Sequence, residues 1–340
     1  MRDIQIVGGG LAGLTLGILL RRERIPVTVW EAGNYPRHRV CGEFISGKGL
    51  EIYEQLSDHL PKGRTARTVR FFLKRKATRI FELPRPASSI SRFQLDQSMA
   101  ELFGHMGGEL RPKSRWTDSY ETEGCVRATG RRAAQKSASK LIGLKVHARD
   151  LPLSADLELH FGRSAYVGLS RLPDGDVNVC GLFRIENSAE LAPERYRKFI
   201  ASHLTERLRP QFEKCQVDES SFCAVAGLSL KPERAGCSKE CRIGDSISMI
   251  APLTGNGMSL AFESASSASD ILGLYSKGKV EWEEARRVIS QNCDKRFGKR
   301  LRYASFLQNC AFSTPGQWLF LCSLKAAPQL FGGLFSVTRK

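Results

Sequence analysis

The sequence predicts an α/β fold in which a Rossmann-like nucleotide-binding domain is interleaved with a mixed β-sheet domain and followed by a helical C-terminus. Three observations support this prediction. A glycine-rich turn separates a short apolar strand from a helix within the first 31 residues. Segments that alternate apolar and polar residues, as half-buried strands do, occupy the middle of the chain. Helical spacing dominates from residue 257 onward.

The chain opens with a strand–helix–strand unit. Residues 3–7 are expected to form a short apolar strand, residues 11–22 a helix rich in leucine, and residues 26–31 a second strand with β-branched side chains. Together they occupy about thirty residues, which is the length that a right-handed parallel crossover needs. This unit is therefore expected to begin a parallel sheet.

Later elements follow from the same periodicities. We predict strands at 69–73, 157–161, 166–172 and 177–183. We predict helices at 91–106, 193–208 and 257–274, with a mostly helical chain from 281. Because the strand-rich segments lie between nucleotide-binding segments, two interleaved domains are expected.

Composition limits the class of protein. No apolar stretch reaches the roughly 18 residues needed to cross a bilayer. An apolar strand begins by Ile4, which leaves no room for a signal peptide, so a cytoplasmic protein is expected. The ten cysteines are scattered without a CxxC pair, and Cys237 and Cys241 stand alone, so we predict free thiols and no metal site.

The chain is strongly basic, with a formal net charge of +17. Such a charge favours encounters with acidic surfaces. The basic residues are spread along the chain, so we predict no nucleic-acid partner, and peripheral contact with an anionic membrane or an acidic carrier protein is considered instead. The densest basic group, residues 286–302, is interpreted as a solvated helix face. Both a monomer and a dimer are compatible with the sequence.

The glycine-rich turn matches the dinucleotide-binding pattern G-x-G-x-x-G over residues 8–13. Gly8 permits the tight turn out of the strand, Gly10 lets the backbone approach a pyrophosphate, and Gly13 allows the helix to pack closely on the sheet. Glu31, at the tip of the second strand, can accept hydrogen bonds from the adenosine ribose. This motif alone fits both NAD and FAD.

A second nucleotide-binding segment lies at residues 241–265. A short strand ends at Gly244 and Asp245, and a turn at 255–257 precedes a long helix. Asp245 at a strand tip can hold a ribityl hydroxyl of a flavin. The N-terminus of a helix stabilises negative charge, and a reduced flavin carries such charge near its N1 and O2 atoms. This segment therefore favours FAD.

At these residues the sequence resembles the flavoprotein monooxygenase superfamily, which includes the aromatic hydroxylases and the geranylgeranyl reductases. Members carry a G-D segment followed by a P-x-x-G-x-G helix start, on the same chain as an N-terminal G-x-G-x-x-G. The match falls on Gly244, Asp245, Pro252, Gly255 and Gly257. The resemblance covers nearly all of the chain up to residue 275 and implies an FAD-binding oxidoreductase.

Two further segments resemble the same superfamily. Residues 36–43 are similar to the P-x-x-K-x-C-G segment of the geranylgeranyl reductases, with Arg39 in place of the lysine. This resemblance implies that Cys41 and Gly42 lie beside the isoalloxazine ring. The stretch S-R-F-Q-L-D is similar to a helix start of the family, which implies that Arg92 reaches the flavin; a surface charge is the alternative.

One segment departs from the superfamily. Most members have A-D-G where this chain has Ala128-Thr129-Gly130, so the aspartate is missing. In the family that aspartate helps to organise pyrophosphate and pyridine-nucleotide contacts. We therefore expect FAD binding to survive, whereas the usual handling of NAD(P)H is in question. The preceding stretch, 109–126, is short for the family, and its small sheet is expected to be trimmed.

These segments divide the chain into three parts. We assign 1–66, 91–135 and 236–278 to a discontinuous FAD-binding domain, 67–90 and 136–235 to a substrate domain, and 279–340 to a C-terminal helical segment. The predicted FAD-binding residues are Gly8, Gly10, Leu11, Ala12, Gly13, Glu31, Arg39, Cys41, Gly42, Arg92, Asp245, Pro252, Gly255, Asn256, Gly257 and Met258. No catalytic side chain is assigned, because in flavoenzymes the cofactor performs the difficult step. Of the six histidines, only His38 falls in a segment expected near the flavin.

Three functions are considered. The first is a monooxygenase, in which NAD(P)H reduces the flavin and a C4a-hydroperoxyflavin hydroxylates a small aromatic or lipophilic substrate covered by the strands near 166–170 and 177–181. The second is a geranylgeranyl reductase-like enzyme that saturates double bonds of a prenyl lipid. It is favoured by the Cys41-Gly42 pair and by an apolar stretch at 318–321 that either rests on a membrane or packs in the core. The third is a flavin-binding protein without catalysis, which only the missing aspartate supports.

Overall fold

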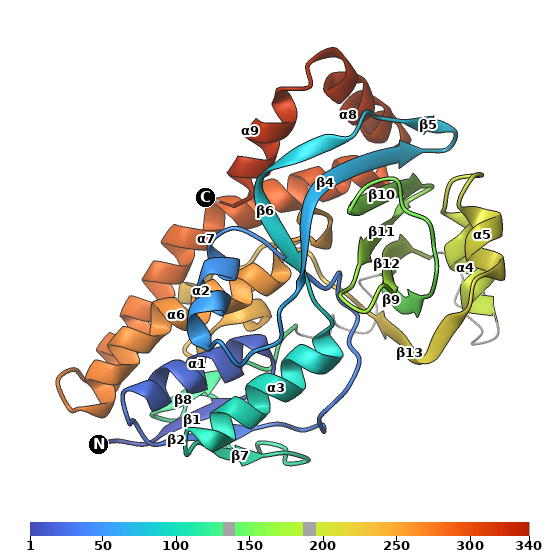
Figure 1. The fold of residues 1–340 in the computed structure, drawn as a ribbon. Helices are drawn as coiled ribbons and strands as arrows, with labels where there is room; N and C mark the ends of the chain where they lie inside the picture. Colours follow the sequence, from blue (N-terminus) through green and yellow to red (C-terminus); the bar gives the residue numbers. More distant parts are fainter. Residues whose placement is uncertain (132–139, 186–194, 340) are drawn as a thin grey trace.

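The computed structural model describes residues 1–131, 140–185 and 195–339, which form two β-sheets with helices packed around them (Figure 1). The strands of the smaller sheet are β1 (Ile4–Val7), β2 (Val27–Trp30), β7 (Glu109–Arg111), β8 (Cys125–Arg127) and β14 (Cys241–Arg242). All of its pairings are parallel, in the order β14–β8–β1–β2–β7. The predicted strand–helix–strand unit is therefore confirmed, and the stretch at 109–126 supplies only short strands, as expected.

Four helices cover the smaller sheet. They are α1 (Leu11–Arg22), α2 (Lys48–Leu56), α3 (Arg92–His105) and α6 (Gly257–Ser276). Helix α1 connects β1 to β2 and packs against both α3 and α6. The side chains of Ile4, Ile6 and Leu14 are fully buried between these layers. Because burial of such side chains contributes about 1.5–3 kcal/mol each, this core fixes the glycine turn between β1 and α1.

Within the described residues, the larger sheet holds nine strands. They are β3 (Phe44–Ile45), β4 (Arg64–Leu73), β5 (Lys76–Ala77), β6 (Phe81–Ser89), β9 (Leu141–Ala148), β10 (Leu157–Gly162), β11 (Ala165–Arg171), β12 (Val177–Arg184) and β13 (Val217–Ala226). Their order is β13–β9–β12–β11–β10–β4–β6–β3, with β5 beside β4. Every pairing is antiparallel except the parallel pair of β4 and β10. All four strands predicted for the middle of the chain are present.

Different helices cover the two faces of the larger sheet. Val146, Val167 and Val179 belong to a core shared with α4 (Tyr196–Ser202) and α5 (Arg209–Lys214). Leu157 and Tyr166 belong to a core shared with α8 (Thr314–Ala326) and α9 (Leu330–Val337). Alternate residues of a strand point to opposite faces, so this second face is available to line a site between the sheet and the helices.

The helix predicted at 193–208 is wrong in its extent. Helix α4 ends at Ser202 and α5 begins at Arg209, while residues 193–194 lie outside the described ranges. Pro210 lies in the first turn of α5, where proline is tolerated, and the residue before a proline disfavours helical dihedrals. The connection buries Leu204 and Leu208, so apolar spacing continues although the helix does not.

The C-terminal third is helical, as predicted, with α7 (Trp282–Phe312) followed by α8 and α9. The interpretation of residues 286–302 as a solvated face is wrong at Arg300, which is 2% exposed and donates two 3.0 Å bonds to the Glu263 carboxylate of α6. Helix α7 runs along α6 (Figure 1), so one of its sides is buried. A guanidinium on that side needs a carboxylate partner, because an unpaired buried charge is costly.

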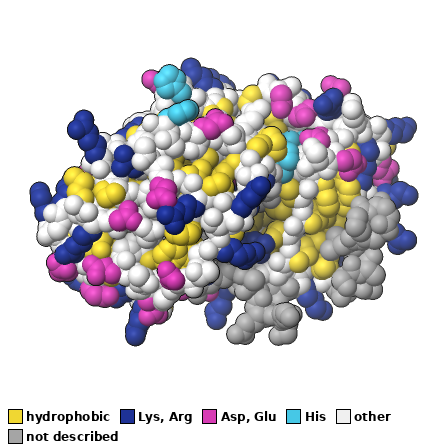
Figure 2. Space-filling model, turned by 90° about the horizontal axis from the view of Figure 1, so that it is seen from below, with side chains coloured by type: hydrophobic (Ala, Val, Ile, Leu, Met, Phe, Trp, Pro, Cys, Tyr) yellow, Lys and Arg dark blue, Asp and Glu magenta, His cyan; other side chains and the backbone are white. Residues whose placement is uncertain are grey.

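The surface agrees with the composition. On the face shown in Figure 2, lysine and arginine side chains are scattered and mixed with acidic ones, and apolar side chains lie between them. Across the described ranges, no helix combines the length and the apolar character that a membrane crossing requires. Within the same ranges no group of three or more side chains could hold a metal ion, and all ten cysteines are free thiols.

Candidate functional site

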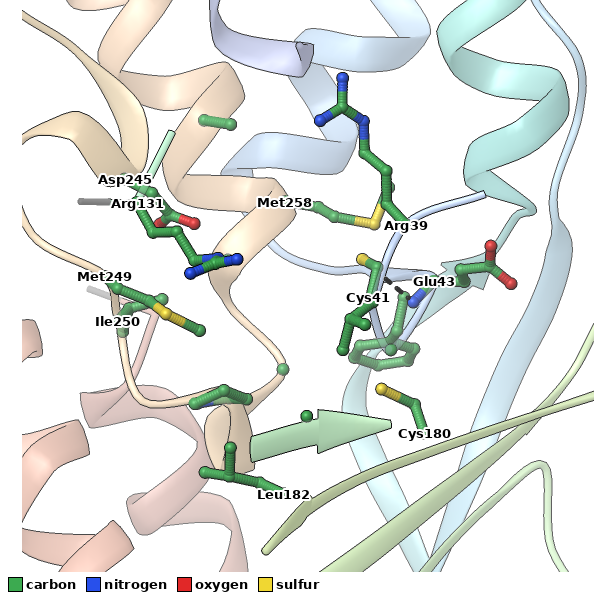
Figure 3. A pocket seen from close by; sticks show the side chains of 18 of the residues that line it. Arg39, Cys41, Glu43, Arg131, Cys180, Leu182, Asp245, Met249, Ile250 and Met258 are labelled. Atoms are coloured by element: carbon green, nitrogen blue, oxygen red, sulfur yellow. Dashed lines mark hydrogen bonds between the residues drawn. The ribbon is translucent and has the colours of Figure 1, made fainter. Parts of the chain in front are cut away.

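A cavity of about 1150 Å³ lies between the two sheets and the C-terminal helices. The glycine turn after β1, the segment 37–44, the loop before α6 and the larger sheet all line it. In Figure 3, Asp245 and Arg131 lie on one side of this pocket, and Arg39 and Cys41 lie on the other. The two predicted nucleotide-binding segments, far apart in the sequence, therefore border one space.

The turn between β1 and α1 consists of glycines for steric reasons. Gly8 has a φ of +115°, and a Cβ there would lie 2.3 Å from the carbonyl oxygen of Ala128. A Cβ on Gly13 would lie 2.0 Å from the carbonyl oxygen of Gly8. A Cβ on Gly10, in contrast, would meet nothing within 4 Å, because Gly10 faces the cavity. Gly10 precedes the uncapped N-terminus of α1, which favours an anionic group at this position.

The Glu31 side chain lies directly beside this turn. It is 5% exposed, and its carboxylate accepts hydrogen bonds from the N–H groups of Gly9 (3.1 Å) and Gly33 (2.7 Å). The Arg37 guanidinium donates a third bond, of 2.7 Å. Glu31 lines the cavity, as a ribose-binding carboxylate must, and it also ties the glycine turn to the strand tip. Arg37 as its partner was not predicted.

Asp245 is a partly buried residue whose carboxyl group has one buried, unused oxygen. Gly244, with a φ of +61°, turns the chain tightly against α1, where a Cβ would lie 2.9 Å from Cβ of Ala12. The Oδ1 atom of Asp245 is buried and has no hydrogen-bond partner in the described part of the chain. Burial raises the pKa of Asp245 to about 6, although the charges of Arg92 and Arg131 act in the opposite direction. A buried, unpaired oxygen that lines a cavity suits a ligand hydroxyl group.

The loop from Pro252 to Met258 forms the wall next to Asp245. Gly255 is in the left-handed region, with a φ of +63°, which favours glycine. Asn256 immediately precedes α6, is fully buried, and donates from Nδ2 to the Thr338 carbonyl oxygen. No side chain caps α6. Because Gly257 and Met258 line the cavity, the positive end of the α6 dipole faces it.

Two arginines share one buried carboxylate on the opposite wall. Arg92 donates to Asp96 through Nε (2.7 Å) and Nη2 (2.8 Å), and Arg39 donates to the same carboxylate through Nε (3.0 Å). The Arg92 side chain is 11% exposed, so the alternative of a surface charge is wrong. Both arginines line the cavity, and Asp96, which was not singled out in the sequence, orients them.

The Cys41-Gly42 pair is held against the larger sheet. Asn178 of β12 donates to the Cys41 carbonyl oxygen at 3.0 Å, and Ser170 of β11 donates to the Gly42 carbonyl oxygen at 3.1 Å. The Cys41 and Cys180 side chains both border the pocket (Figure 3). Burial raises the pKa of both thiols, so they are neutral apolar groups at neutral pH.

The rest of the cavity is an apolar chamber. Its walls come from the larger sheet, α7, α8 and α9. They include Val69, Phe71, Leu83, Leu157, Leu159, Phe161, Tyr166, Leu182, Leu307, Ala311, Phe320, Phe331, Leu334 and Phe335. The apolar stretch at 318–321 was predicted either to pack in the core or to rest on a membrane. Phe320 packs inside and lines the chamber, whereas Trp318 and Leu319 are 57% and 61% exposed.

A buried ionisable cluster behind Cys41-Gly42 escaped the sequence analysis. Glu43 is fully buried, accepts from the Arg92 backbone N–H at 2.9 Å, and contacts His147 Nε2 at 2.7 Å. Lys145 is also fully buried and lies 3.0 Å from the His38 ring nitrogen Nδ1. Lys145 and His147 lie two apart on β9, a strand that the sequence analysis did not predict. Alternation along this segment was the available signal that both side chains point to the same face of a sheet.

Thr129, which replaces the family's aspartate, also borders the cavity. Its hydroxyl accepts a 3.2 Å hydrogen bond from Nε of Arg127, and the Arg127 guanidinium pairs with Glu240 at 2.8 Å. The position thus carries no negative charge toward the cavity.

The residues present fit an FAD. Gly10 leaves open space at a helix N-terminus for a diphosphate, Asp245 has an unused oxygen for a ribityl hydroxyl, and α6 presents a second open N-terminus. The cavity exceeds the roughly 300–1,000 Å³ of ordinary small-molecule sites, which leaves room for a cofactor and a substrate together.

Comparison with protein families agrees with this geometry. A model described as an NAD(P)-binding Rossmann-like domain matches residues 6–43. A model described as squalene epoxidase matches residues 130–311, which is more than half of the chain. A search of curated proteins finds no match.

Solved structures share the fold. PqsL of P. aeruginosa in complex with 2-aminobenzoylacetate is 18% identical, with a TM-score of 0.75 over 98% of this chain and 99% of that one. A geranylgeranyl bacteriochlorophyll reductase-like protein of Thermoplasma acidophilum is 16% identical, with a TM-score of 0.74 over 98% of each chain. The flavin-dependent brominase Bmp2 is 15% identical, with a TM-score of 0.72 over 99% of this chain and 92% of that one.

The resemblance to the flavoprotein monooxygenase superfamily is thereby confirmed by the family match, and the likeness to these structures confirms the fold. The family match covers the segment that contains β9 to β13, Asp245 and the loop before α6. The chain belongs to the squalene epoxidase family and is an FAD-dependent oxidoreductase.

Proposed function

We propose that this enzyme is a monooxygenase that inserts one oxygen atom of dioxygen into a lipophilic or aromatic substrate. The balanced reaction is substrate + O₂ + NAD(P)H + H⁺ → oxygenated substrate + NAD(P)⁺ + H₂O. The observation that supports this proposal is a single cavity with two chemically different parts. One part offers polar groups and helix N-termini suited to FAD, and the other is apolar and suited to a substrate without charge.

In this proposal the protein's own residues bind FAD and orient it. In this proposal Gly10 and Leu11 hold the diphosphate, Glu31 holds the ribose, and Asp245 holds a ribityl hydroxyl. The α6 N-terminus at Gly257 stabilises negative charge at one edge of the flavin ring. When bound, FAD supplies the hydride-accepting and oxygen-activating chemistry. The two-arginine wall around Asp96 adds positive charge on the other side.

The substrate part of the proposal follows from the chamber. Its walls are mainly aromatic and aliphatic, with Gln317 and Arg339 as polar exceptions, so burial of a strongly charged substrate there would be costly. The aromatic compound bound to PqsL and the squalene epoxidase family match represent the two kinds of substrate that we propose, an aromatic ring or an apolar alkene.

We further propose that NAD(P)H binds transiently. Because Thr129 replaces the aspartate, no carboxylate at that position opposes the charge of Arg131 at the cavity, whereas Arg127 is already paired with Glu240. A cation such as Arg131 attracts the phosphates of a pyridine nucleotide without a dedicated nucleotide-binding domain.

A second candidate is the reduction of a carbon–carbon double bond in a prenyl lipid. The Cys41-Gly42 turn, pinned beside the pocket by Ser170 and Asn178, favours it because this segment resembles the geranylgeranyl reductases. The apolar chamber accommodates a prenyl chain equally well.

Oxygen consumption separates these candidates. The protein is reconstituted with FAD, NADPH is added, and oxygen uptake is followed with and without farnesol, squalene or an anthranilate derivative. Oxygen uptake stimulated by one of these compounds supports the monooxygenase. Anaerobic reoxidation of the reduced protein by farnesol supports the reductase. A chain that folds but does not bind FAD contradicts both.

We also propose peripheral contact with a lipid surface. Phe306, Trp318, Leu319 and Leu330 of the C-terminal helices are 47–61% exposed, and the chain carries a net charge of +17. Exposed aromatic and aliphatic side chains together with positive charge favour contact with an anionic lipid surface. Flotation with anionic vesicles tests this, and a Trp318→Ala/Leu319→Ala variant is expected to bind fewer vesicles.

A further inference from the structure

The ionisable cluster behind Cys41-Gly42 consists of His38, Glu43, Lys145 and His147. Lys145 and Glu43 are fully buried and His147 is 5% exposed. In Figure 3 the Glu43 carboxylate points away from Cys41, while its backbone N–H contacts the Cys41 sulfur. The FAD-binding roles proposed above use none of these four side chains.

The backbone at Glu43 is held in an unfavourable conformation. Its φ is +53°, a region that side chains with a Cβ rarely adopt. The Ile90 N–H donates to the Glu43 carbonyl oxygen at 2.9 Å, and the Arg92 N–H donates to its carboxylate at 2.9 Å. Such strain persists where the surroundings enforce it, commonly at functional sites. Here it aims the carboxylate at strand β9.

Short contacts join the four side chains in a row that bends back on itself, because the rings of His38 and His147 lie edge to face with their centroids 5.3 Å apart. His147 Nε2 lies 2.7 Å from Glu43 Oε2, and Lys145 Nζ lies 3.5 Å from Glu43 Oε1. Lys145 Nζ then lies 3.0 Å from His38 Nδ1. His38 and Glu43 both line the cavity, so these two residues are the inner members of the row.

The outer end of the row reaches the edge of the larger sheet. His147 is paired in register with Asp218 on the edge strand β13, and Asp218 is partly exposed. His147 is therefore the member of the row next to the sheet edge, and His38 and Glu43 are the members that border the cavity.

The charges along the row are consistent with proton transfer. An ammonium group has no acceptor site, so Lys145 donates to His38 Nδ1, which requires a neutral His38 ring. Burial and the Lys145 charge lower the pKa of His38 to about 4. Burial alone would raise the pKa of Glu43, but the bond from His147 and the charge of Lys145 outweigh it, and this pKa falls below its ordinary value. The other titratable or charged groups that face the row are Arg39, Cys41, Arg92, Asp176, Cys180, Asp218 and Cys223.

We propose that His147, Glu43, Lys145 and His38 form a relay that carries the proton consumed in each turnover from solvent near Asp218 to the cavity. The inference rests on the proposed monooxygenase function, whose reaction takes up one proton and releases one water. Lys145 passes a proton to His38 Nδ1 while the opposite ring nitrogen of His38 releases one into the cavity. Lys145 is then reprotonated through Glu43 and His147, which take up one proton from solvent, and tautomer exchange of the His38 ring returns the cluster to its starting protonation state.

The first test needs no cofactor. Imidazole pKa values are measured by NMR in the wild type, in Lys145→Met and in His59→Gln, which alters an exposed histidine outside the cluster. The inference predicts that the His38 pKa is low in the wild type and rises in Lys145→Met, while burial keeps it below the ordinary value of about 6.5. An unchanged His38 pKa would overturn the Lys145–His38 link.

The second test measures turnover of the FAD-loaded enzyme with NADPH and whichever of the three probe compounds stimulates oxygen uptake. His38→Ala is expected to lower kcat roughly 100-fold, since positioned proton transfer contributes about 10²–10⁴-fold. Imidazole added to the buffer is expected to restore much of the loss, because His38 borders the cavity, and His59→Gln is expected to retain wild-type kcat.

Three results separate a relay from structural packing. In His38→Ala, a larger solvent deuterium isotope effect on kcat and rescue by imidazole support the relay. A lower kcat without rescue and with an unchanged isotope effect overturns it. If FAD binds but no probe stimulates oxygen uptake, the proposed function fails, whereas the NMR titration still decides whether Lys145 and His38 are linked.

Discussion

The FAD part of the cavity is shaped by the backbone, whereas the part beneath the larger sheet is shaped by side chains. Around Gly8, Gly10 and Gly13 the absence of a Cβ determines where the chain can pass and what can approach it. Beneath the sheet, Glu43, Lys145 and the aromatic chamber residues meet only after distant strands have paired. Stability and ligand binding in the glycine-lined part should therefore be most sensitive to an added Cβ atom. In the part beneath the larger sheet they should be most sensitive to changes in side-chain charge and volume.

The largest expected effect is that of Gly13→Ala. Its Cβ would lie 2.0 Å from the Gly8 carbonyl oxygen, so helix α1 must shift away from β1. Overpacking of this kind costs about 1–3 kcal/mol, and we expect the free energy of unfolding to fall accordingly and FAD affinity to fall at least about 100-fold. Urea unfolding and a fluorescence titration with FAD measure both.

Gly10→Ala is the matched control for that variant. Nothing lies within 4 Å of its Cβ position, so its unfolding free energy should stay within about 0.5 kcal/mol of the wild type while FAD binding weakens. If Gly10→Ala and Gly13→Ala lowered the free energy of unfolding equally, both glycines would serve packing. The claim that Gly10 leaves space for a ligand would then be wrong.

Asp245→Asn should change how stability depends on pH. The pKa of Asp245 is raised from its ordinary 3.8 to about 6 in the folded chain, mainly by burial. The folded chain thus binds this proton more tightly, and the resulting stabilisation is complete below pH 3.8 and is lost as the pH rises through about 6. Asp245→Asn has no titratable group at this position, so its free energy of unfolding does not fall for this reason as the pH rises. Relative to the variant, the wild-type apoprotein should lose on the order of 2 kcal/mol across that range, measured by urea unfolding. Parallel pH profiles would contradict a raised Asp245 pKa.

Leu182→Trp tests the chamber. Leu182 is 3% exposed and lines the cavity on β12, so a larger side chain there fills space that a substrate would occupy. We expect KM for a stimulating probe to rise at least about tenfold while FAD affinity stays within about twofold, because overfilling a packed apolar site costs about 1–3 kcal/mol. Phe306→Ala, at an exposed position on α7, is the control. Loss of FAD binding in Leu182→Trp would show that the two parts of the cavity are not independent.

The smallest effect is expected from Thr129→Asp, which restores the aspartate of the superfamily. Arg127 already contacts Thr129 at 3.2 Å and would pair with the new carboxylate. FAD affinity should change by less than about threefold, since partly exposed ion pairs contribute about 0–1 kcal/mol. A tenfold gain would show that the missing aspartate had weakened the site.

These contrasts also explain what the sequence could predict. Gly8, Gly13, Gly244 and Gly255 are required by local geometry, so a short motif identifies them and the strand–helix–strand unit around them. The parallel sheet and the strands at 69–73 and 157–183 followed from local periodicity in the same way.

The parts of the fold and of the site that the sequence did not predict depend on contacts between residues far apart in the chain. Glu43 and His147 are 104 positions apart, and Arg300 finds Glu263 only because α7 packs along α6. No local pattern distinguishes Arg300 from its solvated neighbours on α7, and no pattern places the C-terminal helices over the chamber. The break between α4 and α5 was missed because buried leucines continue the helical spacing through a turn.

A crystal structure with FAD bound tests the central claim most directly. The account predicts the diphosphate within hydrogen-bond distance of the N–H groups of Gly10 and Leu11, a ribityl hydroxyl on Asp245, and the flavin ring against Gly255–Gly257. An FAD that contacted only one of the two glycine turns, with the other left free, would contradict it.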